Sequence, residues 1–158
     1  MTIRPLASAD RAPLEKILVE TNVFTDDEVS VAMELIDVVL EKKDQKDYVI
    51  YTALAEQGEV AGYFCVGPTP VTVGTFDLYW IAVKPAYHGK GVAKALLGYA
   101  EELLKSVGGR LLVAETSSKP KYDRTRMFYD RTHFVEAARI KDYYNVGDDL
   151  VVYAKYLS

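Results

Sequence analysis

The fold is decided by the stretch Trp80-Ile81-Ala82-Val83-Lys84-Pro85-Ala86-Tyr87-His88-Gly89-Lys90-Gly91-Val92-Ala93. Its first four residues are apolar and typical of a buried strand, which Lys84-Pro85 ends. Gly89 and Gly91 form a turn, and a helix face follows with apolar residues at 92, 96, 99, 103 and 107. A helix that begins after a glycine turn offers free backbone N–H groups, so we expect this turn to bind a phosphate or pyrophosphate.

Two common phosphate-binding motifs do not fit this turn. A P-loop has Gly-x-x-x-x-Gly-Lys-Ser/Thr, but here Lys84 replaces the first glycine and Gly91 replaces the Ser/Thr. A Rossmann turn has Gly-x-Gly-x-x-Gly, and Lys94 takes the place of its third glycine. The sequence therefore disfavours a nucleotide-binding protein of either type.

The remaining chain predicts a mixed α/β domain with one central sheet. The expected order is β-α-α-β-β-β-α-β-α-β-β, within a single domain over residues 1–158. Thr25 and Glu28 have capping-box spacing and predict the start of the second helix. The other predicted segments are strands at 2–4, 48–55, 60–66, 75–83, 111–114, 134–144 and 150–156, and helices at 9–20, 29–41, 92–107 and 122–131.

Composition excludes several classes of protein. The chain has 158 residues and, with 19 basic and 23 acidic side chains, a net charge of −4. Nonspecific nucleic-acid binding is disfavoured by that charge, and no stretch is apolar and long enough for a membrane helix. A single cysteine, Cys65, favours a reducing cytoplasm and a place in the core. Neither His88 nor His133 has a second metal ligand at suitable spacing, so we expect no metal.

The turn resembles a known signature. Arg/Gln-x-x-Gly-x-Gly/Ala after a strand is the acetyl-CoA-binding signature of the GNAT (GCN5-related N-acetyltransferase) superfamily, and here His88 replaces the Arg or Gln. The resemblance implies a sheet whose strands splay apart to form an acetyl-CoA cleft. The implied contacts are backbone groups of Ile81, Ala82 and Val83 for pantetheine, and His88, Gly89, Lys90, Gly91, Val92 and Ala93 for pyrophosphate.

A second signature lies nearer the C-terminus. The family has Asn-x-x-Ala-x-x-Phe/Leu-Tyr followed by Gly-Phe, and this chain is similar, with Tyr122, Thr125, Phe128 and Tyr129 and then His133-Phe134. Tyr122, Thr125 and Phe128 are implied to contact the cofactor. Tyr129 occupies the position of the family's general acid, which protonates the departing thiolate.

The resemblance implies an acetyl-CoA-dependent N-acetyltransferase that acts on an amine of a small molecule, a lysine or a peptide N-terminus. Glu115 would accept the proton of the amine, with Asp77 as its rival, and the Val83 N–H would stabilise the oxyanion. The alternative is a non-catalytic acyl-CoA-binding or sensing module of the same fold.

Several features stay open in the sequence. Bases near the second signature either meet the 3′-phosphate of coenzyme A or form a solvated face: Lys119, Lys121, Arg124 and Arg126. The pair Tyr143-Tyr144 either lines the acceptor pocket or packs on the sheet. Residues 1–60 carry 13 acids and 6 bases, a balance of −7, which favours a cationic acceptor. Relatives are often dimers, so a homodimer is a further expectation.

Overall fold

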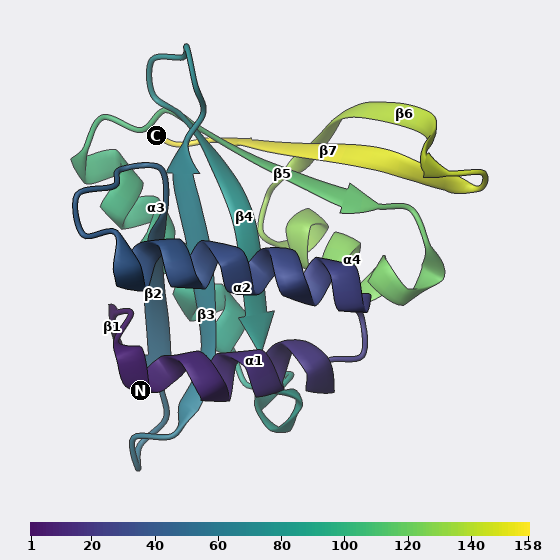
Figure 1. Ribbon diagram of the computed structural model, residues 1–158. Helices are drawn as coiled ribbons and strands as arrows, with labels where there is room; N and C mark the ends of the chain where they lie inside the picture. Colours follow the sequence, from purple (N-terminus) through teal and green to yellow (C-terminus); the bar gives the residue numbers. More distant parts are fainter.

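Seven strands form one sheet in the order β1-β2-β3-β4-β5-β7-β6 in the computed structural model, which describes residues 1–158 (Figure 1). Only the neighbours β4 and β5 are parallel, and every other pair is antiparallel. The strands are β1 (Thr2–Pro5), β2 (Val49–Leu54), β3 (Val60–Pro68), β4 (Thr75–Val83), β5 (Leu111–Ser117), β6 (Val135–Asn145) and β7 (Asp148–Tyr156). The predicted mixed sheet and order of elements are confirmed.

Helices cover both faces of this sheet. The α-helices are α1 (Arg11–Glu20), α2 (Asp26–Glu41), α3 (Val92–Ser106) and α4 (Asp123–Arg131). Helices α1 and α2 pack on one face, where Tyr63 joins their buried residues, and α3 packs on the other, where Phe64 joins a second cluster. Side chains of neighbouring strand residues point to opposite faces, so β3 is buried on both sides. No helix is long and apolar enough to cross a membrane.

The start of α2 depends on local hydrogen bonds. The Thr25 hydroxyl accepts a hydrogen bond from the Glu28 N–H at 3.1 Å, and Oε1 of Glu28 accepts one from the Thr25 N–H at 3.0 Å. This confirms the predicted capping box and leaves Oε2 of Glu28 free for another partner.

Strands β4 and β5 separate soon after they pair. They form only three residue pairs, Thr75 with Leu111, Phe76 with Leu112 and Asp77 with Val113. Just beyond these pairs, the register of β3 against β4 shifts, so that Tyr79 has no partner on β3. This β-bulge increases the local twist of β4. The remaining halves of both strands diverge, which confirms the predicted splayed strands (Figure 1).

Strand β5 is longer than predicted. We expected it to end at Ala114, where the apolar run ends, but it continues to Ser117. Pairing with β7 carries the extension, because Glu115 lies opposite Val152 and Ser117 lies opposite Leu150. Glu115 is therefore held within a strand, which fixes the direction of its side chain.

Candidate active site

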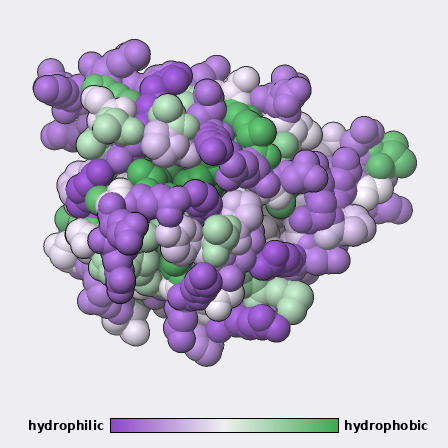
Figure 2. Space-filling view, turned by 90° about the horizontal axis from the view of Figure 1, so that it is seen from below, coloured by the Kyte–Doolittle hydropathy of each residue, from purple (hydrophilic) through white to green (hydrophobic).

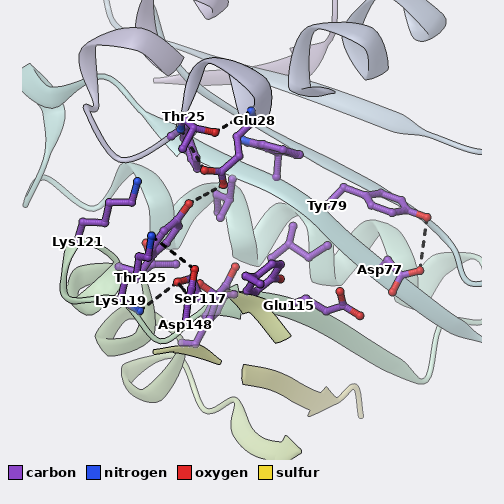
Figure 3. Close-up of a pocket in the computed structure, with 18 of the residues that line it drawn as sticks. Thr25, Glu28, Asp77, Tyr79, Glu115, Ser117, Lys119, Lys121, Thr125 and Asp148 are labelled. Carbon is purple, nitrogen blue, oxygen red and sulfur yellow. Dashed lines mark hydrogen bonds and ion pairs between the residues drawn. The ribbon is translucent and has the colours of Figure 1, made fainter. Parts of the chain in front are cut away.

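A cavity of about 750 Å³ lies where β4 and β5 diverge (Figure 3). Its walls come from the start of α2, the middle of β4, the end of β5, α4 with the short helix before it, and the β6–β7 hairpin. Five of its lining side chains are carboxylates and two are lysines. The excess of acids gives the cavity a negative potential that favours a cationic ligand.

Both predicted candidates for the base line this cavity. Asp77 and Glu115 point to the face of the sheet that carries α1 and α2, because Asp77 pairs with Val113 and Glu115 lies two residues further along β5. Asp77 is half-buried and accepts a hydrogen bond from the Thr69 hydroxyl at 2.8 Å. Glu115 is exposed, so it is the more available of the two for a ligand.

Tyr129 reaches the same cavity from the opposite face of the sheet. It is only 5% exposed, and its ring packs against Phe134 and Tyr153 at centroid distances of 5.0 and 5.2 Å. Burial raises the pKa of the Tyr129 phenol above its usual value. The hydroxyl therefore stays protonated over the whole physiological range and can act as a proton donor.

Tyr122 connects the two sides of the cavity. Its hydroxyl donates a hydrogen bond of 2.6 Å to Oε2 of Glu28, 94 residues away in the sequence (Figure 3). Burial and this bond raise the pKa of Tyr122. Thr125 also lines the cavity, whereas Phe128 packs against the core. The sequence marked Glu28 as a helix cap and as one of the acids that favour a cationic acceptor, and the structure adds its bond to Tyr122.

The basic residues near α4 divide into two groups. Lys119 and Lys121 line the cavity, and Lys119 lies 3.8 Å from Asp148. Arg126 is engaged within the protein, because it donates hydrogen bonds to the carbonyls of Ser117 and Lys119 and pairs with Asp123. Arg126 therefore orders the segment before α4.

The two neighbouring tyrosines of β6 have different surroundings. Tyr144 lines the cavity, and burial together with the negative charge of Glu115 raises its pKa to about 12. Tyr143 is exposed. Only one of the pair can therefore contact a ligand in the cavity.

The open edge of β4 presents unpaired backbone groups. The Lys84 N–H donates to the Ala61 carbonyl at 2.8 Å, and polar groups alternate along an antiparallel strand. Given this register, Ala82 bonds to β3, while the backbone groups of Ile81 and the N–H of Val83 face the gap without a backbone partner, and the Val83 carbonyl bonds to His88. Ile81 lines the cavity with Tyr129. Val83, which the sequence predicts as the oxyanion donor, does not line this cavity.

His88 closes the turn that follows β4. Its Nε2 donates a hydrogen bond of 2.8 Å to the Val83 carbonyl. Gly89 and Gly91 have φ values of +75° and +81°, which glycine adopts without strain. Five backbone N–H groups at this turn have no backbone carbonyl as a partner: those of Gly89, Gly91, Val92, Ala93 and Lys94. They are free donors at the turn that the sequence predicts to bind an anion, and this turn lies outside the cavity.

The single cysteine is far from nucleophilic in its surroundings. Cys65 is buried in the core, and burial raises its pKa to about 12, so the thiolate is scarce. No group of three His, Cys, Asp or Glu side chains is placed to hold a metal ion. Tyr129 and the carboxylates Asp77 and Glu115 are side chains of the cavity that can give or take a proton.

Comparison with known proteins identifies this arrangement. Residues 14–134 match the Acetyltransferase (GNAT) family, a range that contains the turn after β4, Glu115 and Tyr129. The chain belongs to the GNAT family. A structure of a protein assigned to the GNAT acetyltransferases, from Desulfovibrio desulfuricans, is 39% identical, with a TM-score of 0.92 and 99% of each chain covered. The family expected from the sequence is confirmed.

More distant GNAT structures share the fold. An aminoglycoside 6′-N-acetyltransferase complexed with coenzyme A is 14% identical, with a TM-score of 0.77, over 100% of this chain and 98% of its own. The ribosomal-protein-S18-alanine N-acetyltransferase of Escherichia coli is 22% identical, with a TM-score of 0.72, over 99% and 94%. No curated protein matches the sequence.

Proposed function

We propose that the protein transfers the acetyl group of acetyl-CoA directly to an amine, within a complex that holds both substrates. The observation that carries the proposal is the shared cavity of Tyr129 and Glu115, which approach it from opposite faces of the sheet. An acid and a base on opposite sides of one reacting centre suit an acyl transfer with two proton movements.

The open edge of β4 suits the donor substrate. Acetyl-CoA is long, and its pantetheine arm separates the pyrophosphate from the thioester. The N–H groups of the turn from Gly89 to Ala93 would hold the pyrophosphate. Ile81 and Val83 would bond to the amides of pantetheine as an added strand does, and so direct the thioester toward Tyr129.

The reaction then needs three contributions from the chain. Glu115 would take a proton from the ammonium group, and the neutral amine would attack the thioester carbonyl carbon. The Ile81 N–H, which faces the gap beside Tyr129, is the better placed donor for the oxyanion. When the carbon–sulfur bond breaks, Tyr129 would give its proton to the thiolate of coenzyme A. The nitrogen would lose its second proton as the amide forms; this proton restores the Tyr129 phenol, and Glu115 releases its own proton to water.

Tyr122 takes a role that differs from the one implied by the family resemblance. Because its hydroxyl is bonded to Glu28, it would hold that carboxylate at the acceptor side of the cavity. The acceptor would be a cation, in keeping with the acidic walls. A cytoplasmic reaction agrees with the single buried cysteine.

Release of the coenzyme A thiol, followed with a panel of amines, tests the proposal. Glu115→Gln and Asp77→Asn form a matched pair that separates the two carboxylates. We expect Glu115→Gln to lower kcat at neutral pH by about tenfold or more, and Asp77→Asn to have a smaller effect. Binding of coenzyme A by calorimetry with no turnover of any amine would favour a non-catalytic acyl-CoA-binding module instead.

A further inference from the structure

The β6–β7 hairpin is irregular beside the cavity. Regular pairing stops after Ile140 and resumes at Asn145, so residues 141–144 of β6 stand against Asp149 alone. An excess of this kind on one strand bends that strand out of the ladder. Tyr144 lies in the bend, and its ring lines the cavity although it is about half exposed.

No buried core holds Tyr144 in place. All residues of β6 are exposed. The hairpin projects from the body of the protein, with a hydrophobic spot at its end, where Val146 is exposed (Figure 2). The Tyr143 ring packs edge-on against Tyr144 at a centroid distance of 5.0 Å, but Tyr143 is itself exposed. The bend therefore has to be fixed by its own hydrogen bonds.

Asp142 supplies these bonds. Its φ is +55°, in the left-handed region, which aspartate and asparagine adopt more readily than other residues with a side chain. Its Oδ1 accepts a hydrogen bond of 2.8 Å from the Gly147 N–H, which closes the bend across the hairpin turn. Its own N–H donates a hydrogen bond of 3.0 Å to Oδ1 of Asp149. Asp142 thus forms the bend with its backbone and holds it with its side chain.

Asp149 connects the bend to the strand that carries Glu115. Its N–H donates a hydrogen bond of 2.7 Å to the Ser118 hydroxyl, and the Ser118 N–H donates one of 3.0 Å to the Asp149 carbonyl. Ser118 directly follows the end of β5, three residues after Glu115. Arg139 also donates to the Asp149 carboxylate, at 3.3 Å. A continuous set of hydrogen bonds therefore fixes the bend relative to β5.

We propose that Asp142 is a positioning residue, which through this bend places the Tyr144 ring beside Glu115 and so determines which amines the cavity accepts. Burial and the negative charge of Glu115 raise the pKa of Tyr144, in keeping with a hydroxyl near that carboxylate. A tyrosine ring attracts an ammonium ion to its face and takes up the space beside it. Narrow primary amines would be favoured over amines branched next to the nitrogen. The inference rests on the proposed acetyl transfer, in which Glu115 receives the amine.

A spectroscopic measurement tests the positioning without any turnover. In protein with isotope-labelled tyrosine rings, the nuclear magnetic resonance signal of Tyr144 is the one that Tyr144→Phe removes. Asp142→Ala should shift this signal, because alanine disfavours φ +55° and cannot bond to the Gly147 N–H. Asp142→Asn keeps a side-chain oxygen and tolerates this conformation, so the signal should keep its wild-type position. An unmoved signal in Asp142→Ala would overturn the proposal.

Thiol release tests the selectivity with two amines: the fastest acceptor of an amine panel, and its analogue methylated on the carbon next to the nitrogen. The ratio of their kcat/KM values should fall at least about tenfold in Tyr144→Ala and Asp142→Ala, and stay at the wild-type value in Asp142→Asn. The KM of acetyl-CoA should not change. Tyr156→Ala removes an exposed tyrosine of β7 that does not line the cavity, so this control should keep the wild-type ratio.

The two measurements separate failure of this proposal from failure of the acetyl transfer. Circular dichroism checks that each variant is folded. A Tyr144→Ala variant with the wild-type ratio would overturn the role in selectivity even where the transfer itself is confirmed. A wild-type protein that turns over no amine would count against the transfer, whereas a shifted Tyr144 signal in Asp142→Ala would still support the positioning.

Discussion

The hydroxyl of Tyr129 is the group whose removal tests the proposed chemistry most directly. In Tyr129→Phe the ring keeps its contacts with Phe134 and Tyr153, at 5.0 and 5.2 Å, so the core stays filled. We therefore expect the free energy of unfolding to change by less than about 1 kcal/mol. The thiolate would lose its proton donor, and kcat should fall by about 10² to 10⁴-fold, as for other general acids.

The assay follows thiol release at saturating acetyl-CoA, and calorimetry measures coenzyme A binding separately. Tyr153→Phe is the matched control, because it removes a phenol from the same cluster but not from the cavity. Since burial raises the pKa of Tyr129, its proton should not be lost at neutral or mildly alkaline pH. A Tyr129→Phe variant with the wild-type kcat would refute the assignment of the acid.

Three further changes have distinct outcomes. Gly91→Ala puts a side chain at φ +81°, so we expect about 1 kcal/mol less stability by urea unfolding and a higher KM for acetyl-CoA. Tyr122→Phe removes the bond to Glu28, so the KM of the acceptor should rise while that of acetyl-CoA stays unchanged in steady-state kinetics; the reverse pattern would contradict this. Burial of Asp10 is outweighed by hydrogen bonds from Arg4 and a backbone N–H, so its pKa is lowered. Asp10→Asn should therefore destabilise the fold at pH 7, and the difference from wild type should shrink as the pH falls through the pKa of folded Asp10; a constant difference in unfolding experiments would exclude this linkage.

The sequence predicted the elements well because their signals are local. Apolar periodicity and the Thr25–Glu28 capping box depend on residues within one turn or strand, and the structure contains them. The turn at Gly89 and Gly91 was recognisable for the same reason. The predicted end of β5 was wrong because Glu115 and Ser117 are held in the strand by pairing with β7, which is remote in the sequence.

Other site features depend on contacts that no local pattern encodes. The hydrogen bond between Tyr122 and Glu28 joins residues that are 94 positions apart, and no local sequence pattern around either residue predicts it. We propose Ile81 rather than Val83 as the oxyanion donor because only Ile81 lines the cavity, which the sequence does not reveal. The bulge at Tyr79 arises from the register between β3 and β4, and it moves the following side chains to the other face.

Only three residue pairs, between β4 and β5, join the two parts of the sheet. The first part, β1 to β4, is followed by the turn at Gly89 and Gly91, and the second, β5 to β7, carries Glu115. Because so few residue pairs join the two parts, a small rotation of β1 to β4 against β5 to β7 would widen or narrow the gap between β4 and β5.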